Sequence, residues 1–298
     1  MNGISNIQPQ ASVIIPTRNR LDTLRKAIRS AFKQTVKLEI LVMDDGSTDN
    51  TVAIVRAEFP AVQIFTLGFG KGPTFQRNRG AELANAEVLI TLDDDCVFSD
   101  AKVVERILDL FGSNEVAGVT MPFVNTLTSN RTIWCNAPSA EGRYQTGSFF
   151  GGMVALRKDS FIRVGGYREI MFMQGEEPDL ALRLLDAGFI IICGHGKCIN
   201  HLESPVRDNT KLQYLGARNA IYYIWLNAPV VVLPFHLLLS SAVSIRQGFH
   251  LGRPITGFRA VFDGLTGIAV CWQWRRPVSF HSYWKMRALR RVKIKLAD

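Results

Sequence analysis

Short apolar runs alternate with amphipathic segments along the first 121 residues, and this alternation constrains the fold more than any other feature of the chain. Strands are expected at 11–16, 38–46, 62–67, 87–92 and 116–121, and helices at 20–32, from Ser47 or Thr48 to Phe59, at 73–86 and at 101–111. Strands separated by helices form a parallel sheet whose faces the helices cover. We therefore predict an α/β fold with a mainly parallel central sheet and helices on both faces.

Composition fits a globular protein in a reducing compartment. The chain has 298 residues, of which 47% are hydrophobic and 20% charged, so it can bury a core and is not disordered. Its five cysteines show no framework spacing, which favours a cytoplasmic location. The first ten residues have neither the basic nor the apolar part of a signal peptide, so none is expected.

The net charge of +9 is confined to one end of the chain. From Arg246 to Asp298 there are eleven lysines and arginines and two acids, whereas residues 1–245 carry 24 bases and 24 acids. A neutral body with a basic end predicts an anionic partner for that end alone. Because no RNA- or DNA-binding motif is present, we expect no nucleic-acid partner.

An uncharged run, residues 219–245, precedes the basic end. Its most apolar part, PVVVLPFHLLLSSAV, contains two prolines and a histidine, which argue against a simple membrane-spanning helix. Tryptophans stand among the arginines further on, as they do in interfacial anchors. We expect a helical region over 206–298 that binds the anionic inner face of the plasma membrane peripherally. The alternative is a buried helix followed by a solvated basic tail.

Polar clusters follow three of the predicted strands. TRNR comes after the first strand, DDGSTD after the second and DDD after the fourth. In open α/β sheets, ligands bind outside the carboxyl ends of the strands. The sequence therefore predicts one pocket lined by all three clusters.

Asp93, Asp94 and Asp95 are the most informative of these residues, because adjacent carboxylates beside a buried strand repel one another and lose hydration. On an extended chain Asp93 and Asp95 point the same way and Asp94 points to the other face. Mg²⁺ and similar cations bind oxygen ligands, so Asp93 and Asp95 could hold one. The alternative is a solvated acidic loop or a helix N-cap.

Two further clusters allow the same choice between a binding role and a local structural one. Asp45 could accept hydrogen bonds from a base or ribose, or could serve an ordinary turn. Arg77 opens a helix that follows a glycine-bearing turn, so it could pair with a diphosphate or could be an exposed basic side chain.

The segments VIIPTRNR, LVMDDGSTD, GPTFQRNRG and LITLDDD occur in this order. They are followed by FFGGMVALRKDSFIRVGGY (149–167) and GEEPDLALRLLDAGFII (175–191). Together they resemble the family 2 inverting glycosyltransferases over about two-thirds of the chain. The resemblance implies a GT-A, Rossmann-like catalytic domain over 1–205 that binds a nucleotide diphosphosugar, followed by the helical region 206–298.

The resemblance also implies roles for individual residues. It implies catalysis by Glu177 with Glu176 beside it; nucleotide contacts by Pro16, Thr17, Asp45 and Arg77; acceptor contacts by Gly151 and Gly152; and Mg²⁺ or Mn²⁺ at Asp93 and Asp95, with His201 as a further ligand. We add Arg18 and Asp94 as expected nucleotide contacts. Glu177 replaces the usual Asp, so which glutamate is the base stays open, and Gln76 stands where Ala is usual. A carboxylate at Glu177 next to Glu176 is expected to have a raised pKa, which suits a base.

These features predict a metal-dependent, inverting transfer of a hexose or deoxyhexose from a nucleotide diphosphosugar to a hydroxyl. UDP- or dTDP-sugars are favoured over GDP-sugars as donors, and a lipid-linked or cell-envelope glycan as acceptor. The Gln-x-x-Arg-Trp motif of processive synthases is absent, which favours single additions. The alternatives are a non-catalytic sugar-nucleotide-binding protein and, less favoured, a nucleotidyltransferase, for which IPTRNRLDT lacks the required glycines.

Overall fold

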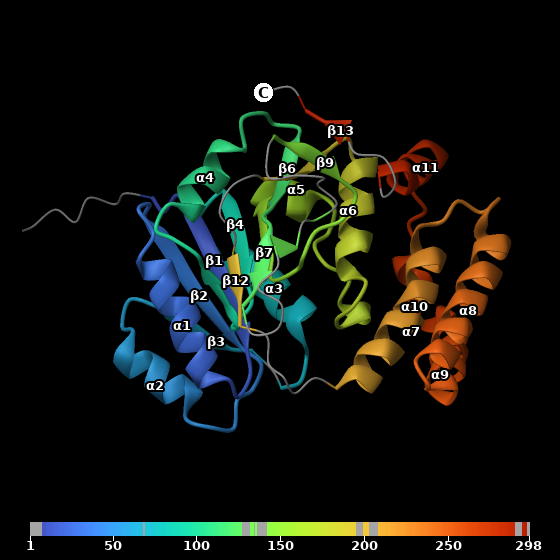
Figure 1. Ribbon diagram of the computed structural model, residues 1–298, viewed down its shortest axis with the longest axis horizontal. Coiled ribbons are helices and arrows are strands. Elements are labelled where there is room, and N and C mark those ends of the chain that lie inside the picture. The colour runs from blue at the N-terminus through green and yellow to red at the C-terminus, as the bar shows by residue number, and fades with distance from the viewer. Residues whose placement is uncertain are drawn as a thin grey trace, which may run out of the picture.

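The computed structural model describes residues 8–67, 69–126, 132–133, 135, 142–194, 199–202, 208–289 and 294–296. The described residues form a central sheet of nine strands (Figure 1). Its strand order is β13 (Ile294–Lys295), β9 (Tyr144–Thr146), β11 (Ile190–Cys193), β6 (Val116–Thr120), β10 (Met153–Arg157), β4 (Val88–Leu92), β1 (Ala11–Thr17), β2 (Leu38–Asp44) and β3 (Gln63–Thr66).

The first four predicted strands form the parallel half of this sheet. β1 pairs in parallel with β2 and with β4, and β2 with β3. Antiparallel pairing enters with β10, which lies between β4 and β6. Because Thr17 of β1 lies opposite Asp44 of β2, these strands end at the same edge, as the prediction of one pocket requires.

Helices cover both faces of the sheet, as predicted. Alternate residues of β1 supply the two cores: Val13 and Ile15 face one side and Ile14 the other. The first side packs against α1 (Leu21–Phe32), α2 (Thr51–Glu58) and α4 (Val103–Asp109). The second packs against α3 (Pro73–Leu83), α5 (Lys158–Arg163) and α6 (Glu176–Asp186).

The predicted start of α2 was wrong. The helix begins at Thr51, and Asp49 Oδ1 accepts a hydrogen bond from the Thr51 N–H. The side chains expected to cap it belong to another contact: Ser47 Oγ accepts from the Asn19 N–H, and Thr48 N–H donates to Asn19 Oδ1. These bonds join the loops after β1 and β2, so they serve the edge of the sheet.

A smaller sheet lies beside the central one. Its order is β5 (Cys96–Phe98), β12 (Ile199–His201), β7 (Phe123–Asn125) and β8 (Thr132–Ile133). His201 lies opposite Cys96 in the antiparallel β5–β12 pair. This pairing brings a residue far along the chain next to the aspartate cluster that follows β4.

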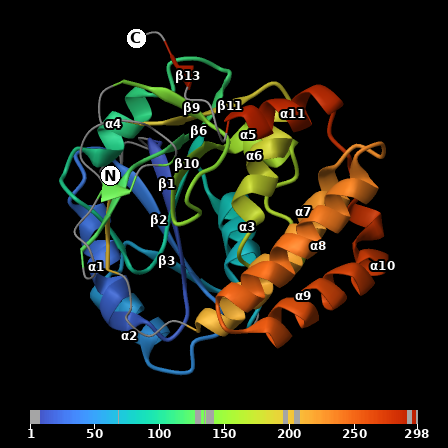
Figure 2. The same ribbon diagram turned by 45° about the vertical axis from the view of Figure 1, so that its right-hand side comes forward.

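The C-terminal region is helical, as expected (Figure 2). It consists of α7 (Asn209–Asn227), α8 (Leu233–His250), α9 (Pro254–Thr266), α10 (Ile268–Cys271), α11 (Phe280–Leu289) and a short 3₁₀ helix, η2 (Trp272–Trp274). Another 3₁₀ helix, η1 (Glu169–Met171), precedes α6. α11 packs on α6, and β13 pairs with β9, so the end of the chain returns to the central sheet. Among the described helices, none is both long and apolar enough to cross a membrane.

Asp179 of α6 joins the sheet-bearing part to the C-terminal helices. It is fully buried, and its two oxygens accept hydrogen bonds from Arg168 (2.6 Å), from Arg183 (2.8 Å) and from Asn227 at the end of α7 (2.7 Å). Burial opposes ionisation, but the two guanidinium groups outweigh it and lower the pKa of Asp179. A buried charge held in this way strongly penalises the loss of any one partner.

We expect Asp179→Ala to lower the free energy of unfolding by about 3–5 kcal/mol, because it strands two buried arginines. Urea denaturation followed by circular dichroism measures this loss. Asp186→Ala, in the same helix, is the control: Asp186 is exposed and accepts one bond, from the Ser279 N–H, so about 1 kcal/mol is expected. Equal losses for the two variants would show that Asp179 does not stabilise the contact between α6 and α7.

Candidate functional site

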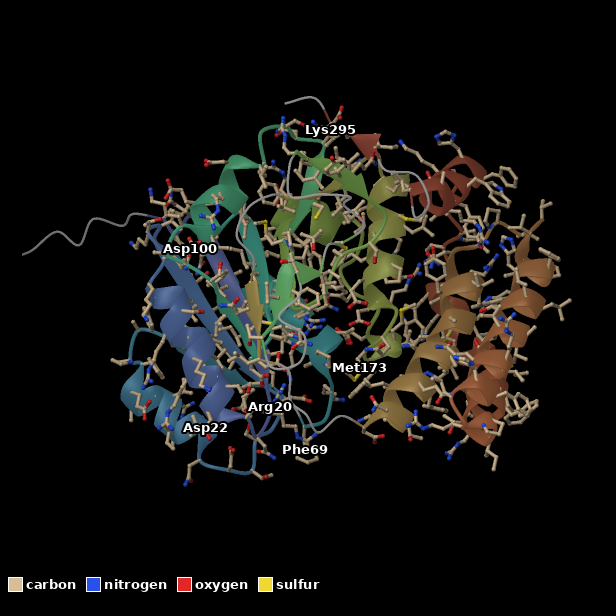
Figure 3. All side chains as sticks on the ribbon, viewed as in Figure 1. Arg20, Asp22, Phe69, Asp100, Met173 and Lys295 are labelled. Carbon is tan, nitrogen blue, oxygen red and sulfur yellow. The ribbon has the colours of Figure 1, made fainter. Side chains whose placement is uncertain are left out.

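One pocket of about 660 Å³ opens at the carboxyl ends of β1, β2 and β4 and at the start of α6. The labelled Arg20 and Met173, which both line it, lie between the sheet and α7 in Figure 3. All thirteen residues to which the sequence assigns a role line this pocket: Pro16, Thr17, Arg18, Asp45, Arg77, Asp93, Asp94, Asp95, Gly151, Gly152, Glu176, Glu177 and His201. The structure thus brings them together, whereas their individual roles stay predictions.

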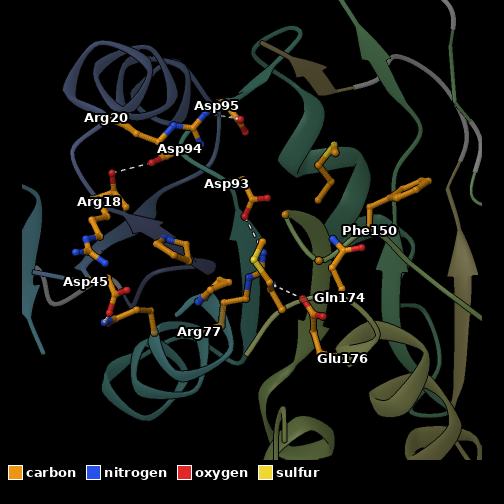
Figure 4. A pocket seen from close by; sticks show the side chains of 18 of the residues that line it. Arg18, Arg20, Asp45, Arg77, Asp93, Asp94, Asp95, Phe150, Gln174 and Glu176 are labelled. Atoms are coloured by element: carbon orange, nitrogen blue, oxygen red, sulfur yellow. Dashed lines mark hydrogen bonds and ion pairs between the residues drawn. The ribbon is translucent and has the colours of Figure 1, made fainter. Parts of the chain in front are cut away.

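The chain turns at the aspartate triplet instead of running on extended. The Cys96 N–H donates to Asp93 O (2.9 Å), and Asp94 and Asp95 lie in the turn. The expectation that Asp93 and Asp95 point the same way and Asp94 the other way was therefore wrong. Asp94 and Asp95 share one guanidinium partner, and Asp93 faces a different one (Figure 4).

Arg20 binds Asp94 and Asp95 through its two terminal nitrogens. Its Nη1 donates to Asp94 Oδ1 (2.7 Å) and its Nη2 to Asp95 Oδ2 (2.8 Å). Thr17 Oγ1 also donates to Asp94 (2.8 Å), but burial dominates there and raises the pKa of Asp94 to about 7. For Asp95, burial is outweighed by the hydrogen bond from His201 and by the charge of Arg20, and its pKa falls to about 2. Asp95 therefore remains an anion at neutral pH.

Asp95, Cys96 and His201 form the group of three potential metal ligands found among the described residues, with ligand atoms within 4.8 Å of one another. His201 Nε2 is 3.5 Å from Asp95 Oδ1, and its buried Nδ1 has no partner among the described residues. Burial raises the pKa of the Cys96 thiol well above its usual value, so it offers no thiolate. An ionised carboxylate oxygen suits Mn²⁺ or Mg²⁺, and a thiol that keeps its proton gives no preference to a soft metal.

Arg77 lies between the aspartates and the glutamates. Its Nη2 donates to Asp93 Oδ1 (2.7 Å), and its Nη1 lies 3.4 Å from Glu176 Oε1. Arg77 is buried, whereas the Asp93 side chain is 39% exposed and faces the pocket. Sequence reasoning gave Arg77 a nucleotide contact; the structure shows it engaged with these two carboxylates.

The two glycines after Phe150 give these groups room. A Cβ on Gly152 would lie 2.1 Å from Asp93 Cγ. A Cβ on Gly151 would lie 2.8 Å from Arg77 Nη1 and 3.0 Å from Glu177 Oε1. Gly151 and Gly152 therefore let Asp93, Arg77 and Glu177 keep their positions, and a Cβ at either site would displace the ends of these side chains.

Glu176 and Glu177 begin α6 and differ in their surroundings. Glu176 is buried, and burial first, then the neighbouring Glu177, raise its pKa to about 8. Its Oε2 has no partner among the described residues. Glu177 is half-buried at the pocket wall. The raised pKa that the sequence predicted for the second glutamate is found at the first, because Glu176 is the one removed from water.

The loop that delivers these glutamates is held from α7. Phe172, Gln174 and Gly175 have φ angles of 64°, 69° and 96°, which is a strained conformation for the first two. Asn219 Nδ2 donates to the carbonyl oxygens of Met171, Met173 and Gln174 at 2.6–2.9 Å. One buried amide therefore fixes the backbone immediately before Glu176.

Asp45 is satisfied by the protein on the other side of the pocket. Its oxygens accept from the backbone N–H groups of Lys71 (2.9 Å) and Gly72 (3.1 Å) and from Gln76 Nε2 (2.9 Å). The glutamine that departs from the family pattern thus buttresses Asp45. Arg18, nearby, stacks over the exposed ring of Phe69 at 4.4 Å.

Several lining residues were missed by sequence reasoning. Arg20 stands in the TRNR cluster, so its place beside the aspartates could have been suspected. Asp208, Lys211 and Leu212 at the start of α7 reach the pocket from a segment with no local functional signal, as do Phe123, Met173 and Gln174. Phe150 also lines the pocket and stands in the segment 149–167 that carries the family resemblance.

Two curated relatives show the range of similarity. The "GalNAc(5)-diNAcBac-PP-undecaprenol beta-1,3-glucosyltransferase" of Campylobacter jejuni is 39% identical over 92 residues, which are 29% of this chain and 30% of that protein. Glycosyltransferase AglE of Haloferax volcanii is 25% identical over 231 residues, 73% of this chain and 75% of that one. The chain thus spans under a third of the length of the first of these relatives.

Solved structures agree on the fold. A mannosyltransferase from Pyrobaculum calidifontis, in complex with GDP-Man and Mn²⁺, matches 95% of this chain and 80% of its own with a TM-score of 0.60 at 17% identity. TarS of S. aureus, in complex with UDP-GlcNAc, matches 86% of this chain and 81% of its own, also at 0.60, with 16% identity. These similarities confirm the GT-A fold. The model described as Glycosyl transferase family 2 matches residues 12–173, more than half of the chain, and the chain therefore belongs to glycosyl transferase family 2.

Proposed function

We propose that this protein is an inverting, non-processive glycosyltransferase. It transfers one sugar from a nucleotide diphosphosugar to a hydroxyl of a lipid-linked or cell-envelope glycan. One observation carries the proposal: a single pocket presents aspartates from the end of β4 opposite glutamates from the start of α6, with Arg77 between them (Figure 4). An inverting displacement needs a leaving-group side and a base side that face each other.

The aspartate side receives the donor in this proposal. Asp95 and His201, together with Asp93, would hold Mg²⁺ or Mn²⁺, which would supply positive charge for the departing diphosphate. Arg20 keeps Asp95 oriented through its second nitrogen. Structural neighbours in complex with GDP-Man and Mn²⁺ or with UDP-GlcNAc support this donor class. We favour a UDP- or dTDP-sugar, with Pro16, Thr17, Arg18 and Asp45 near the nucleoside.

Glu177 is the base on the glutamate side. It is half-buried at the pocket wall, beside Gly151, where an acceptor hydroxyl can reach it. Burial raises the pKa of its neighbour Glu176 to about 8, so Glu177 stands next to a carboxyl group that holds its proton at neutral pH. In this proposal Glu177 takes the hydroxyl proton as the new bond forms.

The acceptor and the location follow from the relatives and from the basic end. The C. jejuni relative is named for an undecaprenol-linked substrate. The last 53 residues carry the whole net positive charge of this chain. We propose that the protein works in the cytoplasm, peripherally bound to the inner face of the plasma membrane.

Glu177→Gln is expected to abolish sugar transfer while leaving UDP affinity unchanged, because the amide keeps the size of the side chain and cannot accept the proton. Glu176→Gln, the matched neighbour, should retain transfer. Donor turnover with a panel of UDP- and dTDP-sugars and isothermal calorimetry with UDP and Mn²⁺ give the two readouts. Loss of transfer in the Glu176 variant alone would reassign the base. UDP binding without turnover by the wild type, across donors and acceptors, would favour the non-catalytic binding protein.

Asp95→Ala should weaken UDP binding in Mn²⁺ by about tenfold or more, equivalent to about 1.4 kcal/mol. The physical reason is that it removes the one triplet carboxylate whose pKa is held near 2. Calorimetry with and without EDTA measures the effect. Asp109→Ala, at an exposed position of α4, is the control and should bind as the wild type does. Mn²⁺-dependent affinity that survives Asp95→Ala would exclude Asp95 as a ligand.

The buried Glu176 also makes stability depend on pH. Its pKa is about 8 in the folded protein and about 4.5 in the unfolded chain, so the folded state binds more protons between these values. The free energy of unfolding should therefore fall as pH rises from 4.5 to 8 and level off above. Glu176→Gln should remove part of this slope, measured by urea denaturation at pH 5–9. An unchanged slope would mean that Glu176 is ionised throughout.

A further inference from the structure

The α8–α9 pair is apolar on the outside. Its exposed side chains are mostly large and apolar: Phe235, Leu238, Leu239, Val243 and Phe249 in α8, and Ile255, Phe258, Phe262 and Leu265 in α9. Leu238 is 73% and Ile255 81% exposed. These residues recur at helical spacing, so they form one stripe along each helix. A helix of a water-soluble protein turns such a stripe toward the core.

The buried side of the same helices is small or polar. α8 buries His236, Ser244 and Gly248, and α9 buries Gly257, Ala260, Val261 and Gly264. His236 Nδ1 is 2.6 Å from the hydroxyl of Tyr283 in α11. Leu233 and Leu237 of α8 pack against the core, but most of its other large apolar side chains face outward, the reverse of a soluble helix. Inversion of this kind is typical of helices whose outer side meets hydrocarbon and whose small residues face each other.

Glycines allow the two helices to pack backbone to backbone. A Cβ on Gly248 would lie 3.2 Å from Gly257 Cα, and a Cβ on Gly257 would lie 3.3 Å from Gly248 Cα. The rings of Phe249 and Phe258 meet edge to face at 6.0 Å beside this contact. The small residues therefore lie between the two helices, and the large apolar side chains lie outside.

Basic residues outnumber acidic ones in and after this helix pair. Residues 229–289 contain seven lysines and arginines: Arg246 in α8, Arg253 immediately before α9, Arg259 in α9, and Arg275, Arg276, Lys285 and Arg287 after α9. Asp263 is the single acid in this range, and its Oδ2 already accepts from the Tyr214 hydroxyl (2.7 Å) and lies 3.6 Å from Arg259 Nε. The surface therefore combines exposed apolar groups with an excess of positive charge.

We propose that the outer stripes of α8 and α9 insert into one leaflet of an anionic phospholipid bilayer, and that the neighbouring arginines and lysines bind its headgroups. The helices lie in the leaflet without crossing it, in keeping with the finding that no described helix could span a membrane. This inference rests on the membrane association included in the proposed function, and it assigns that association to a defined surface.

A second copy of this chain is the competing occupant. A symmetric contact would place seven bases and one acid of each copy against the same set of the other, and like charges at an interface oppose association. An anionic leaflet matches both the apolar stripes and the positive charge. The surface also lies close to the reaction site in the fold: α7 packs against both α8 and α9, and its first turn lines the pocket. A lipid-linked acceptor would thus be presented near Glu177.

Cosedimentation of the full chain with vesicles tests the assignment. The wild type should bind vesicles of phosphatidylcholine with about 30 mol% phosphatidylglycerol more tightly than vesicles of phosphatidylcholine alone. The double variant Leu238→Asp/Phe262→Asp should lower the partition coefficient by about tenfold or more, because it places charge in both stripes. Arg246→Gln/Arg259→Gln should reduce the preference for the anionic vesicles.

The matched control is Phe32→Asp/Leu83→Asp, which introduces the same charge at exposed apolar positions of α1 and α3 and should bind vesicles as the wild type does. Val231→Asp, at an 87% exposed position before α8, supplies a variant with little effect on folding. Thermal shift by UDP with Mn²⁺ checks that each variant is folded. Equal vesicle binding by wild type and stripe variants, or none by the wild type, would overturn the proposal.

Sedimentation velocity without vesicles separates the two occupants. A wild-type dimer that the stripe variants convert to monomer, with vesicle binding unchanged, would assign the surface to a second copy instead. Transfer and vesicle binding are read independently. Normal donor turnover with no vesicle binding would contradict the membrane surface and leave the proposed transferase intact. Vesicle binding without turnover would contradict the transferase and leave the membrane surface intact.

Discussion

Crowded negative charge at one edge of the sheet is the constraint around which the pocket is built. Five carboxylates, Asp93, Asp94, Asp95, Glu176 and Glu177, line a single cavity, and a folded protein tolerates this only if each charge is paired or neutralised. Arg20 pairs with two of them and Arg77 with two others. Burial keeps a proton on Glu176 at neutral pH. Asp95 is left ionised and beside His201, which is the condition that a divalent cation requires.

Arg77 connects the two sides of the proposed reaction. It bonds to Asp93, on the side assigned to the donor diphosphate, and to Glu176, next to the proposed base. Gly151 and Gly152 are needed because the carboxylates and the guanidinium leave no room for a Cβ. The proposed leaving-group side and base side are therefore linked through the hydrogen bonds of Arg77, beside two residues without side chains.

The C-terminal helices complete the site as well as extending the chain. Asn219 of α7 fixes the loop before Glu176, and Asn227 at the end of the same helix bonds to Asp179 of α6. α7 is thus tied at one point to the loop before α6 and at another to α6 itself. Since α8 and α9 pack on α7, the surface proposed to bind a membrane is connected through α7 to the wall of the pocket.

The sequence by itself determined the strand–helix alternation, the family resemblance and the identity of the residues that gather at the sheet edge, because periodicity and strand-end position are local properties of the chain. The orientation of the side chains within the site was decided by tertiary structure. Asp93 and Asp95 have different partners because the chain turns after β4, and the pKa of Glu176 is raised because packing buries that side chain. The α7 contribution and the inverted polarity of α8 likewise depend on which elements meet. Contacts between segments far apart in the chain leave no pattern in either segment alone.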